Sequence, residues 1–249
     1  MNEKLITQVG LEIHVQLKTK SKMFCGCDNN AQDKEPNTVI CPICLGMPGT
    51  LPVANRAAIE MTIKTGIVLG SMIPKISKFD RKHYFYPDLP KGYQISQYDQ
   101  PFCVGGSVEV DGKVVTLNRI HLEEDAGKLV HPEGSNSSIV DLNRAGTPLM
   151  EIVTEPDIES PAQARSFLKE LQIILRSTGV SDADMEKGHL RCDANISVKS
   201  ADTMSEIVEI KNLNSFKYVE KALSTEEERL INEFYNDAYK KKKQNLLLN

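Results

Sequence analysis

The stretch that decides the fold is Gly10-Leu11-Glu12-Ile13-His14-Val15-Gln16-Leu17-Lys18. Apolar residues occupy every second position from Val9 onward, and this two-residue period predicts a β-strand with one buried face. Glu12 and His14 then point together from the opposite face of the strand. A carboxylate and an imidazole held next to each other on a rigid strand can form half of a metal site or of an acid–base pair.

Four cysteines follow in two close pairs, Cys25 with Cys27 and Cys41 with Cys44. The polar segment between the pairs is typical of a loop, which one tetrahedral zinc ion bound to four thiolates would close. A redox pair and four unconnected thiols are the alternatives. No signal peptide is recognised, so we expect a cytoplasmic, reducing environment in which structural disulfides are rare. The sequence thus predicts a structural zinc loop at residues 24–45, with no ligand position left for water or substrate.

Composition sets the outer limits. The chain has 249 residues, of which 40% are hydrophobic and 26% charged, so a packed core is expected. No run of about 18 apolar residues occurs, which argues against a membrane-spanning helix. The net charge of −4 gives no support for nucleic-acid binding, although a local basic patch could still contact phosphates.

The remainder of the chain alternates helix and strand patterns. We expect helices at residues 55–69, 160–179 and from 215 onward, a hairpin with an Asp-Gly turn at 108–115, and strands at 189–199 and 208–211. In the first helix, the stripe expected to face the core is Ala58, Met61, Thr65 and Val68. This order of elements predicts an α+β fold in which helices cover one face of a largely antiparallel sheet.

Polar residues recur on the outward faces of the predicted strands. Glu12 and His14 come from the first strand, and the strand at 189–199 adds Arg191, Asp193 and Asn195. Each of these residues alone could be a solvated surface group. Their recurrence on one strand after another is typical of an open active-site sheet instead.

Two further segments contribute acids. Glu151 lies inside the apolar run at 148–153, where a carboxylate needs a compensating cation or hydrogen bonds. The segment 121–128 contains Glu123 and Glu124, although His121 and Glu123 taken alone are interpreted as solvated groups. Oxygen ligands with a single imidazole suit Mg²⁺ or Mn²⁺, so we expect such an ion on this face of the sheet.

A dense aromatic segment occupies residues 82–97, with two lysines and a turn stiffened by proline. We expect Lys82, Tyr84 and Tyr86 to line a nucleotide pocket together with the polar residues of strand 189–199. The alternative is an aromatic loop that packs on the core. The chain has no glycine-rich P-loop, so a bound ATP would have to be held by metal and sheet residues.

The sequence as a whole resembles the B-subunit family of the tRNA-dependent amidotransferases that make Gln-tRNA(Gln) or Asn-tRNA(Asn). The resemblance extends over residues 5–233, and its most specific runs are residues 9–15, 78–88, 92–97, 121–128, 141–153, 190–195 and 211–215. Ordered runs of this length are far more specific than a single short motif.

The resemblance implies a function and a set of metal ligands. Family members use ATP and Mg²⁺ to phosphorylate the side-chain carboxylate of mischarged Glu-tRNA(Gln) or Asp-tRNA(Asn), and ammonia then displaces the phosphate. A glutaminase A subunit supplies the ammonia, and a small C subunit completes the heterotrimer. His14, Glu124 and Glu151 match the family's metal ligands, with Glu12 close by. Strict alternation along the strand favours Glu123 over Glu124, but a bulge or the end of the strand could reverse the direction, and the prediction follows the family.

The resemblance also implies a fold of the glutamine synthetase and guanido kinase group. We expect a catalytic domain at residues 1–235 and a disordered lysine-rich tail at 236–249, without the family's helical and tRNA-binding domains. Two other functions stay open: an ATP-dependent carboxylate ligase that needs no tRNA, and a zinc-bearing scaffold without catalytic activity. The expected enzyme is a glutamine-dependent ligase that forms a carbon–nitrogen bond.

Overall fold

The computed structural model describes residues 5–31, 33–201 and 203–236. Its main sheet has the strand order β11-β10-β1-β9-β6-β4, and β5 pairs with β6 as a seventh strand. The strands of this sheet are β1 (Ile6–Gln16), β4 (Cys103–Val104), β5 (Ser107–Val110), β6 (Lys113–Glu124), β9 (Pro148–Thr154), β10 (Leu190–Lys199) and β11 (Val208–Leu213). All of their pairings are antiparallel.

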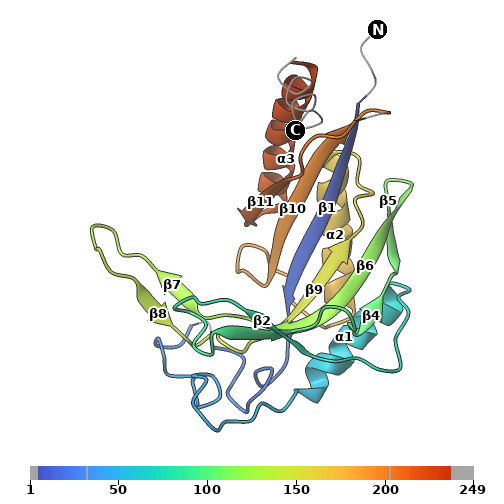
Figure 1. Cartoon of the computed structure of the whole chain (residues 1–249). Coiled ribbons are helices and arrows are strands. Elements are labelled where there is room, and N and C mark those ends of the chain that lie inside the picture. Colours follow the sequence, from blue (N-terminus) through green and yellow to red (C-terminus); the bar gives the residue numbers. More distant parts are fainter. Residues whose placement is uncertain (1–4, 32, 202, 237–249) are drawn as a thin grey trace, which may run out of the picture.

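Helices and two small hairpins complete the described part of the chain. The helices are α1 (Arg56–Val68), α2 (Pro161–Ser177) and α3 (Phe216–Tyr235). The hairpins are β2 (Asp80–His83) with β3 (Tyr93–Ser96), and β7 (Lys128–Val130) with β8 (Ile139–Asp141). Figure 1 shows β1 near the middle of the sheet and the β7–β8 ribbon extending away from it. Of the predicted tail at 236–249, residues 237–249 lie outside the described residues.

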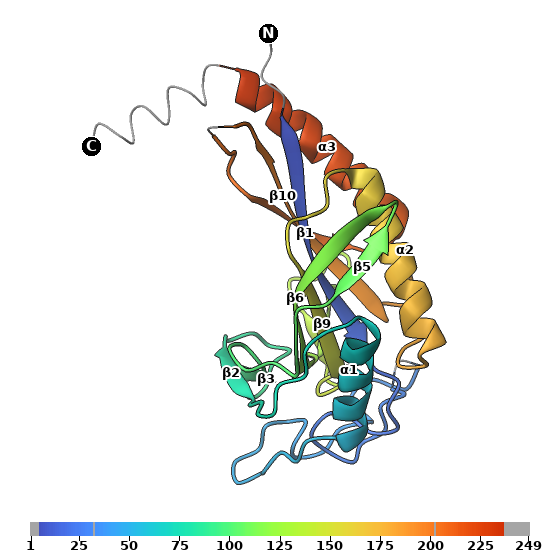
Figure 2. The ribbon, with the colours of Figure 1, turned by 90° about the vertical axis from the view of Figure 1, so that its right-hand side faces the viewer.

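The two faces of the main sheet have different coverings. Helices α2 and α3 lie against one face, and the β2–β3 hairpin lies on the opposite side of the sheet (Figure 2). The predicted α+β class with a largely antiparallel sheet is therefore confirmed. Among the described helices, none is both long and apolar enough to cross a membrane.

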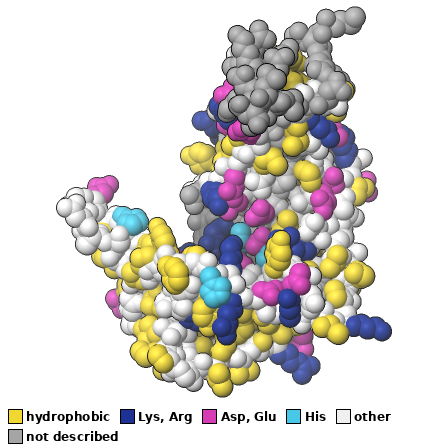
Figure 3. Space-filling model, viewed as in Figure 1, with side chains coloured by type: hydrophobic (Ala, Val, Ile, Leu, Met, Phe, Trp, Pro, Cys, Tyr) yellow, Lys and Arg dark blue, Asp and Glu magenta, His cyan; other side chains and the backbone are white. Residues whose placement is uncertain are grey.

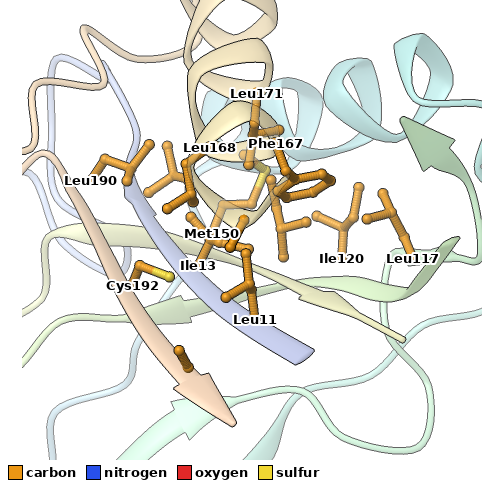
Figure 4. Packing of buried hydrophobic residues seen from close by; sticks show 14 of the residues in the cluster. Leu11, Ile13, Leu117, Ile120, Met150, Phe167, Leu168, Leu171, Leu190 and Cys192 are labelled. Atoms are coloured by element: carbon orange, nitrogen blue, oxygen red, sulfur yellow. The ribbon is translucent and has the colours of Figure 1, made fainter. Parts of the chain in front are cut away.

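The core forms between the sheet and helix α2. The apolar residues of β1 alternate as predicted, and Val9, Leu11, Ile13 and Val15 are each at most 1% exposed. Phe167 of α2 is fully buried and reaches toward Ile120 and Met150 of the sheet (Figure 4). Because these side chains occupy the helix-covered face, the polar residues between them are left on the open face.

Local signals in the sequence set the helix starts and the tight turn. The side chains of Asn55, Ser160 and Ser215 each accept a hydrogen bond from a backbone N–H in the first turn of α1, α2 and α3. Asp111 and Gly112 both have positive φ, 54° and 73°, which is the backbone conformation of the predicted Asp-Gly hairpin turn.

The predicted core stripe of α1 is partly wrong. Ala58 and Thr65 are buried, but Val68 is 52% exposed, and Thr62 and Gly66 are buried instead. A Cβ atom added at Gly66 would lie 2.3 Å from the sulfur of Cys103 in β4. The helix therefore approaches the sheet through small side chains, which a search for large apolar residues does not detect.

Candidate active site

The open face of the sheet and the β2–β3 hairpin enclose a cavity of about 1090 Å³. Glu12, His14, Glu151 and Arg191 line it from the sheet, and Lys82 lines it from the hairpin. Figure 3 shows charged and histidine side chains gathered over the hollowed centre of this face. The predicted outward-facing residues thus meet in one place.

Strand register produces a row of polar side chains across four strands. His14 in β1 lies opposite Arg191 in β10 on one side and opposite Glu151 in β9 on the other. Glu151 in turn lies opposite His121 in β6. Because directly opposed residues project to the same face, Arg191, His14, Glu151 and His121 follow one another across the sheet.

Three of these strands supply a compact group of ligand atoms. His14 Nε2 lies 3.3 Å from Glu151 Oε2 and 3.7 Å from Glu123 Oε1. One ligand atom from each of these three residues lies within 4.8 Å of the other two. One imidazole and two carboxylates are a suitable donor set for Mg²⁺ or Mn²⁺, so the residues present fit a divalent cation.

Glu124, which the prediction took from the family, lies outside this group. Its Oε1 accepts hydrogen bonds from Lys91 Nζ at 2.5 Å and from the backbone N–H of Ile95 at 2.9 Å. β6 pairs regularly with β9 from His121 to Glu124, and its register shift lies earlier, between Leu117 and Arg119, so no bulge turns Glu124 toward His14. Glu124 is the last residue of β6. Alternation along β6 therefore brings Glu123 beside His14, whereas the Glu124 carboxylate contacts Lys91 and β3.

His121 and Glu123 are not solvated surface groups, so that interpretation was wrong. They are 3% and 4% exposed. His121 Nε2 lies 3.1 Å from Glu151 Oε2, and its Nδ1 is buried without a hydrogen-bond partner in the described structure. Burial alone would lower the pKa of His121, but its interactions with Glu123 and Glu151 outweigh burial and raise the pKa to about 9.

The same contacts act on the other two members of the group. Burial favours the neutral form of Glu151, but the hydrogen bonds with His121 and His14 prevail and lower the pKa of its carboxyl group. Burial also opposes the charge on His14, and the neighbouring carboxylates of Glu151 and Glu123 nevertheless raise its pKa.

The remaining predicted residues have different positions. Asn195 donates a hydrogen bond from Nδ2 to Glu12 Oε1 at 3.1 Å, and Asp193 lies opposite Glu12 in the β1–β10 pairing. Tyr84 lines the cavity with Lys82, and burial raises the pKa of its hydroxyl to about 12. Tyr86 is 57% exposed and is not among the residues that line the cavity.

Two residues that the sequence did not single out hold the site in place. Ser96 in β3 donates its hydroxyl hydrogen bond to Glu123 Oε2 at 2.8 Å. Asp125, which is 5% exposed, accepts a hydrogen bond from Arg191 at 2.6 Å. Sequence patterns could not identify these partners, because each contact joins segments that lie far apart along the chain.

The four predicted zinc ligands form a second group. Cys44 Sγ lies 3.6 Å from Cys25, 3.7 Å from Cys41 and 3.9 Å from Cys27. Four sulfurs on a zinc ion at about 2.3 Å would be separated by roughly 3.8 Å, so the arrangement fits tetrahedral zinc. A hydrogen bond from Cys25 and the nearby charge of Lys22 lower the pKa of the Cys44 thiol to about 4.

Comparisons with known proteins identify the family of the chain. The family model described as the GatB/GatE catalytic domain matches residues 7–246. The chain is 58% identical over 231 residues to a protein of Thermomicrobium roseum that is named as the B subunit of an aspartyl/glutamyl-tRNA(Asn/Gln) amidotransferase. That match covers 90% of this chain and 48% of the relative.

Two other relatives carry the same name. One, from Thermotoga maritima, is 56% identical over 233 residues, and one from Thermodesulfovibrio yellowstonii is 54% identical over 229 residues. Each match covers 90% of this chain and 48% of the relative, so the chain spans about half the length of the curated relatives it matches. By its match to the family model, the chain belongs to the GatB/GatE catalytic-domain family.

Proposed function

We propose that this chain provides the site at which a tRNA-dependent amidotransferase activates its substrate with ATP. The side-chain carboxylate of Glu-tRNA(Gln) or Asp-tRNA(Asn) would attack the γ-phosphorus of ATP, releasing ADP and forming an acyl phosphate. Ammonia would then displace phosphate and leave the amide. The observation that carries the proposal is the group of His14, Glu123 and Glu151 in the cavity, in a chain whose relatives are named as B subunits of an aspartyl/glutamyl-tRNA amidotransferase.

The chain's own residues would hold the magnesium ion and keep its ligands in place. His14, Glu123 and Glu151 would bind Mg²⁺, with Glu12 nearby on the same strand as His14. A bound Mg²⁺ would neutralise charge on the phosphoryl group during its transfer. Ser96 fixes Glu123 by a hydrogen bond, and His121 fixes Glu151 from the opposite side. Partners of this kind orient metal ligands before the ion binds.

The cavity also has groups that suit a nucleotide. Arg81, Lys82 and Arg191 line it beside Tyr84, so cations and an aromatic ring are available for phosphates and base. Asp125 holds the guanidinium of Arg191 by a hydrogen bond of 2.6 Å. We assign ATP to this cavity. Asp193 and Asn195, which lie on β10 with Arg191, are proposed as further nucleotide-binding residues.

The wider assembly is part of the same proposal. We infer a glutaminase A subunit as the ammonia source, a small C subunit, a cytoplasmic location, and a fold of the glutamine synthetase and guanido kinase group. The relatives are named as B subunits, which supports a multi-subunit enzyme. The sheet with one open polar face and one helix-covered face supports the fold assignment.

The test is ADP formation by the chain combined with a glutaminase subunit, with and without mischarged tRNA. We expect ADP formation to require Mg²⁺ and Glu-tRNA or Asp-tRNA, and added glutamine to yield the amidated aminoacyl-tRNA. ADP formed with a free carboxylate and no tRNA would identify a tRNA-independent ligase instead. If the chain neither bound ATP with Mg²⁺ nor formed ADP, the catalytic proposal would be wrong.

We also propose that the four cysteines hold structural zinc. Protein purified without chelator should contain about one zinc per chain, and Cys41→Ser should release it and increase hydrogen exchange across residues 24–45. The matched control is Cys103→Ser, whose sulfur lies in β4 outside this group and should leave the zinc in place. Elemental analysis that finds no zinc in the wild-type protein would refute the assignment.

A further inference from the structure

Lys22 is fully buried beside the cysteine group. It is 0% exposed, and it is among the largest side chains that the fold buries completely. Its Nζ donates hydrogen bonds to the backbone carbonyl of Val39 at 2.9 Å and to Cys44 Sγ at 3.5 Å. Lysine normally extends its ammonium group to water, so a lysine that ends inside the protein has a specific partner there.

The partner is not a carboxylate. Among the described residues, no aspartate or glutamate oxygen lies within 4.0 Å of the Lys22 ammonium. A carbonyl oxygen satisfies one N–H group but does not offset the positive charge. A buried ammonium without an opposing charge is strongly unfavourable, so the negative charge must come from the sulfurs.

The backbone around Lys22 holds the side chain in this position. Lys22 donates its N–H to the carbonyl of Cys27, and Asn55 donates a side-chain hydrogen bond to the Lys22 carbonyl. The next residue, Met23, donates its N–H to Gly146. A Cβ atom at Gly146 would lie 3.7 Å from the Lys22 side chain, which shows how closely that side chain packs against this segment. These contacts hold the ammonium group beside Cys44.

We propose that Lys22 is the outer cation of the zinc site and strengthens zinc binding. Zinc bound to four thiolates carries a net charge of −2, and Cys44, the thiolate that Lys22 contacts, is the buried member of the group. An N–H donor to Cys44 and one positive charge would offset part of that charge. This inference rests on the proposed zinc site and adds to it a residue that is not a ligand.

The test compares Lys22→Met with the wild type by chelator competition for zinc. Methionine fills similar space without charge or an N–H donor, and we expect the dissociation constant for zinc to rise about 10- to 100-fold. The matched control is Lys34→Met, because Lys34 lies in the same loop but is exposed and pairs with Asp28. Lys34→Met should bind zinc as tightly as the wild type.

A second measurement separates an electrostatic role from simple packing. Zinc should raise the melting temperature of Lys22→Met less than that of the wild type. Without zinc, the melting temperature of the variant should be similar to that of the wild type or higher. If Lys22 only packed, the substitution would lower the melting temperatures of the zinc-bound and zinc-free protein equally. The affinity for zinc would then be unchanged. If Lys22→Met does not fold, Lys22→Gln, which keeps a donor but not the charge, is measured in the same two ways.

The outcomes distinguish the two proposals. If the wild type binds no zinc, the zinc assignment itself fails. If the wild type binds zinc and the Lys22 variant binds it with the same affinity, only the role of Lys22 is wrong. Weaker binding by the Lys22 variant together with unchanged binding by Lys34→Met supports the inference.

Discussion

Replacing His14 or Glu151 by alanine is expected to reduce the rate of ATP-dependent phosphorylation of mischarged tRNA by about a thousandfold or more. Either change removes a ligand from the group that would bind Mg²⁺. Metal stabilisation of a phosphoryl transition state contributes several kcal/mol, and each ~1.4 kcal/mol corresponds to a tenfold change in rate. The measurement is the initial rate of ADP formation over a range of Mg²⁺ concentrations, with the chain combined with the proposed glutaminase subunit.

The neighbouring glutamates provide the matched comparison. Glu123→Gln should lose Mg²⁺ affinity as His14→Ala does, because Glu123 lies beside His14 and Glu151. Glu124→Gln should keep Mg²⁺ affinity, because the Glu124 carboxylate binds Lys91 and the backbone of β3 instead. All variants should retain zinc and glutamine hydrolysis by the partner subunit. The opposite result for the two glutamates would show that Glu124, and not Glu123, faces the metal site.

Replacing Phe167 by alanine is expected to lower the free energy of unfolding by about 3–5 kcal/mol. The ring is fully buried between α2 and the central strands, where it faces Met150 and Ile120 (Figure 4). Its removal eliminates buried apolar surface and leaves a cavity that the rigid sheet cannot fill. Urea denaturation followed by circular dichroism measures the change.

The control for this variant lies on the same helix. Ile173 in α2 is 56% exposed, so Ile173→Ala should change the free energy of unfolding by no more than about 0.5 kcal/mol. A similar loss in both variants would mean that burial against the sheet does not distinguish the two positions, since alanine has the higher helix propensity and propensity alone predicts no loss. A loss below about 1 kcal/mol for Phe167→Ala would contradict the packing described for the core.

Local rules account for the parts of the fold that the sequence predicted correctly. Alternation along β1 determined which face is buried, and Asn55, Ser160 and Ser215 determined where the helices begin. The Asp-Gly pair determined the β5–β6 turn. Each of these features depends on residues within a few positions of one another, so no knowledge of distant segments is needed to predict it.

Pairing between distant segments explains what the sequence left open. The choice between Glu123 and Glu124 depended on whether β6 bulges before its end, and only its pairing with β9 shows that the bulge lies earlier. The burial of His121 likewise depends on its register opposite Glu151. No local pattern encodes such a register when the strands are far apart along the chain.

The sequence by itself determined the α+β class, the helix starts and the strand that carries Glu12 and His14. It also showed the two closely spaced cysteine pairs of the proposed zinc site. Only the tertiary structure decided which glutamate meets His14, and that Lys22 lies buried against Cys44. The physical reason is that the alternation of side chains between the two faces of a strand depends on that strand alone, so it can be predicted from the sequence. Which charges share a buried space depends on how strands, loops and hairpins meet, and those contacts set the cost of burying each charge.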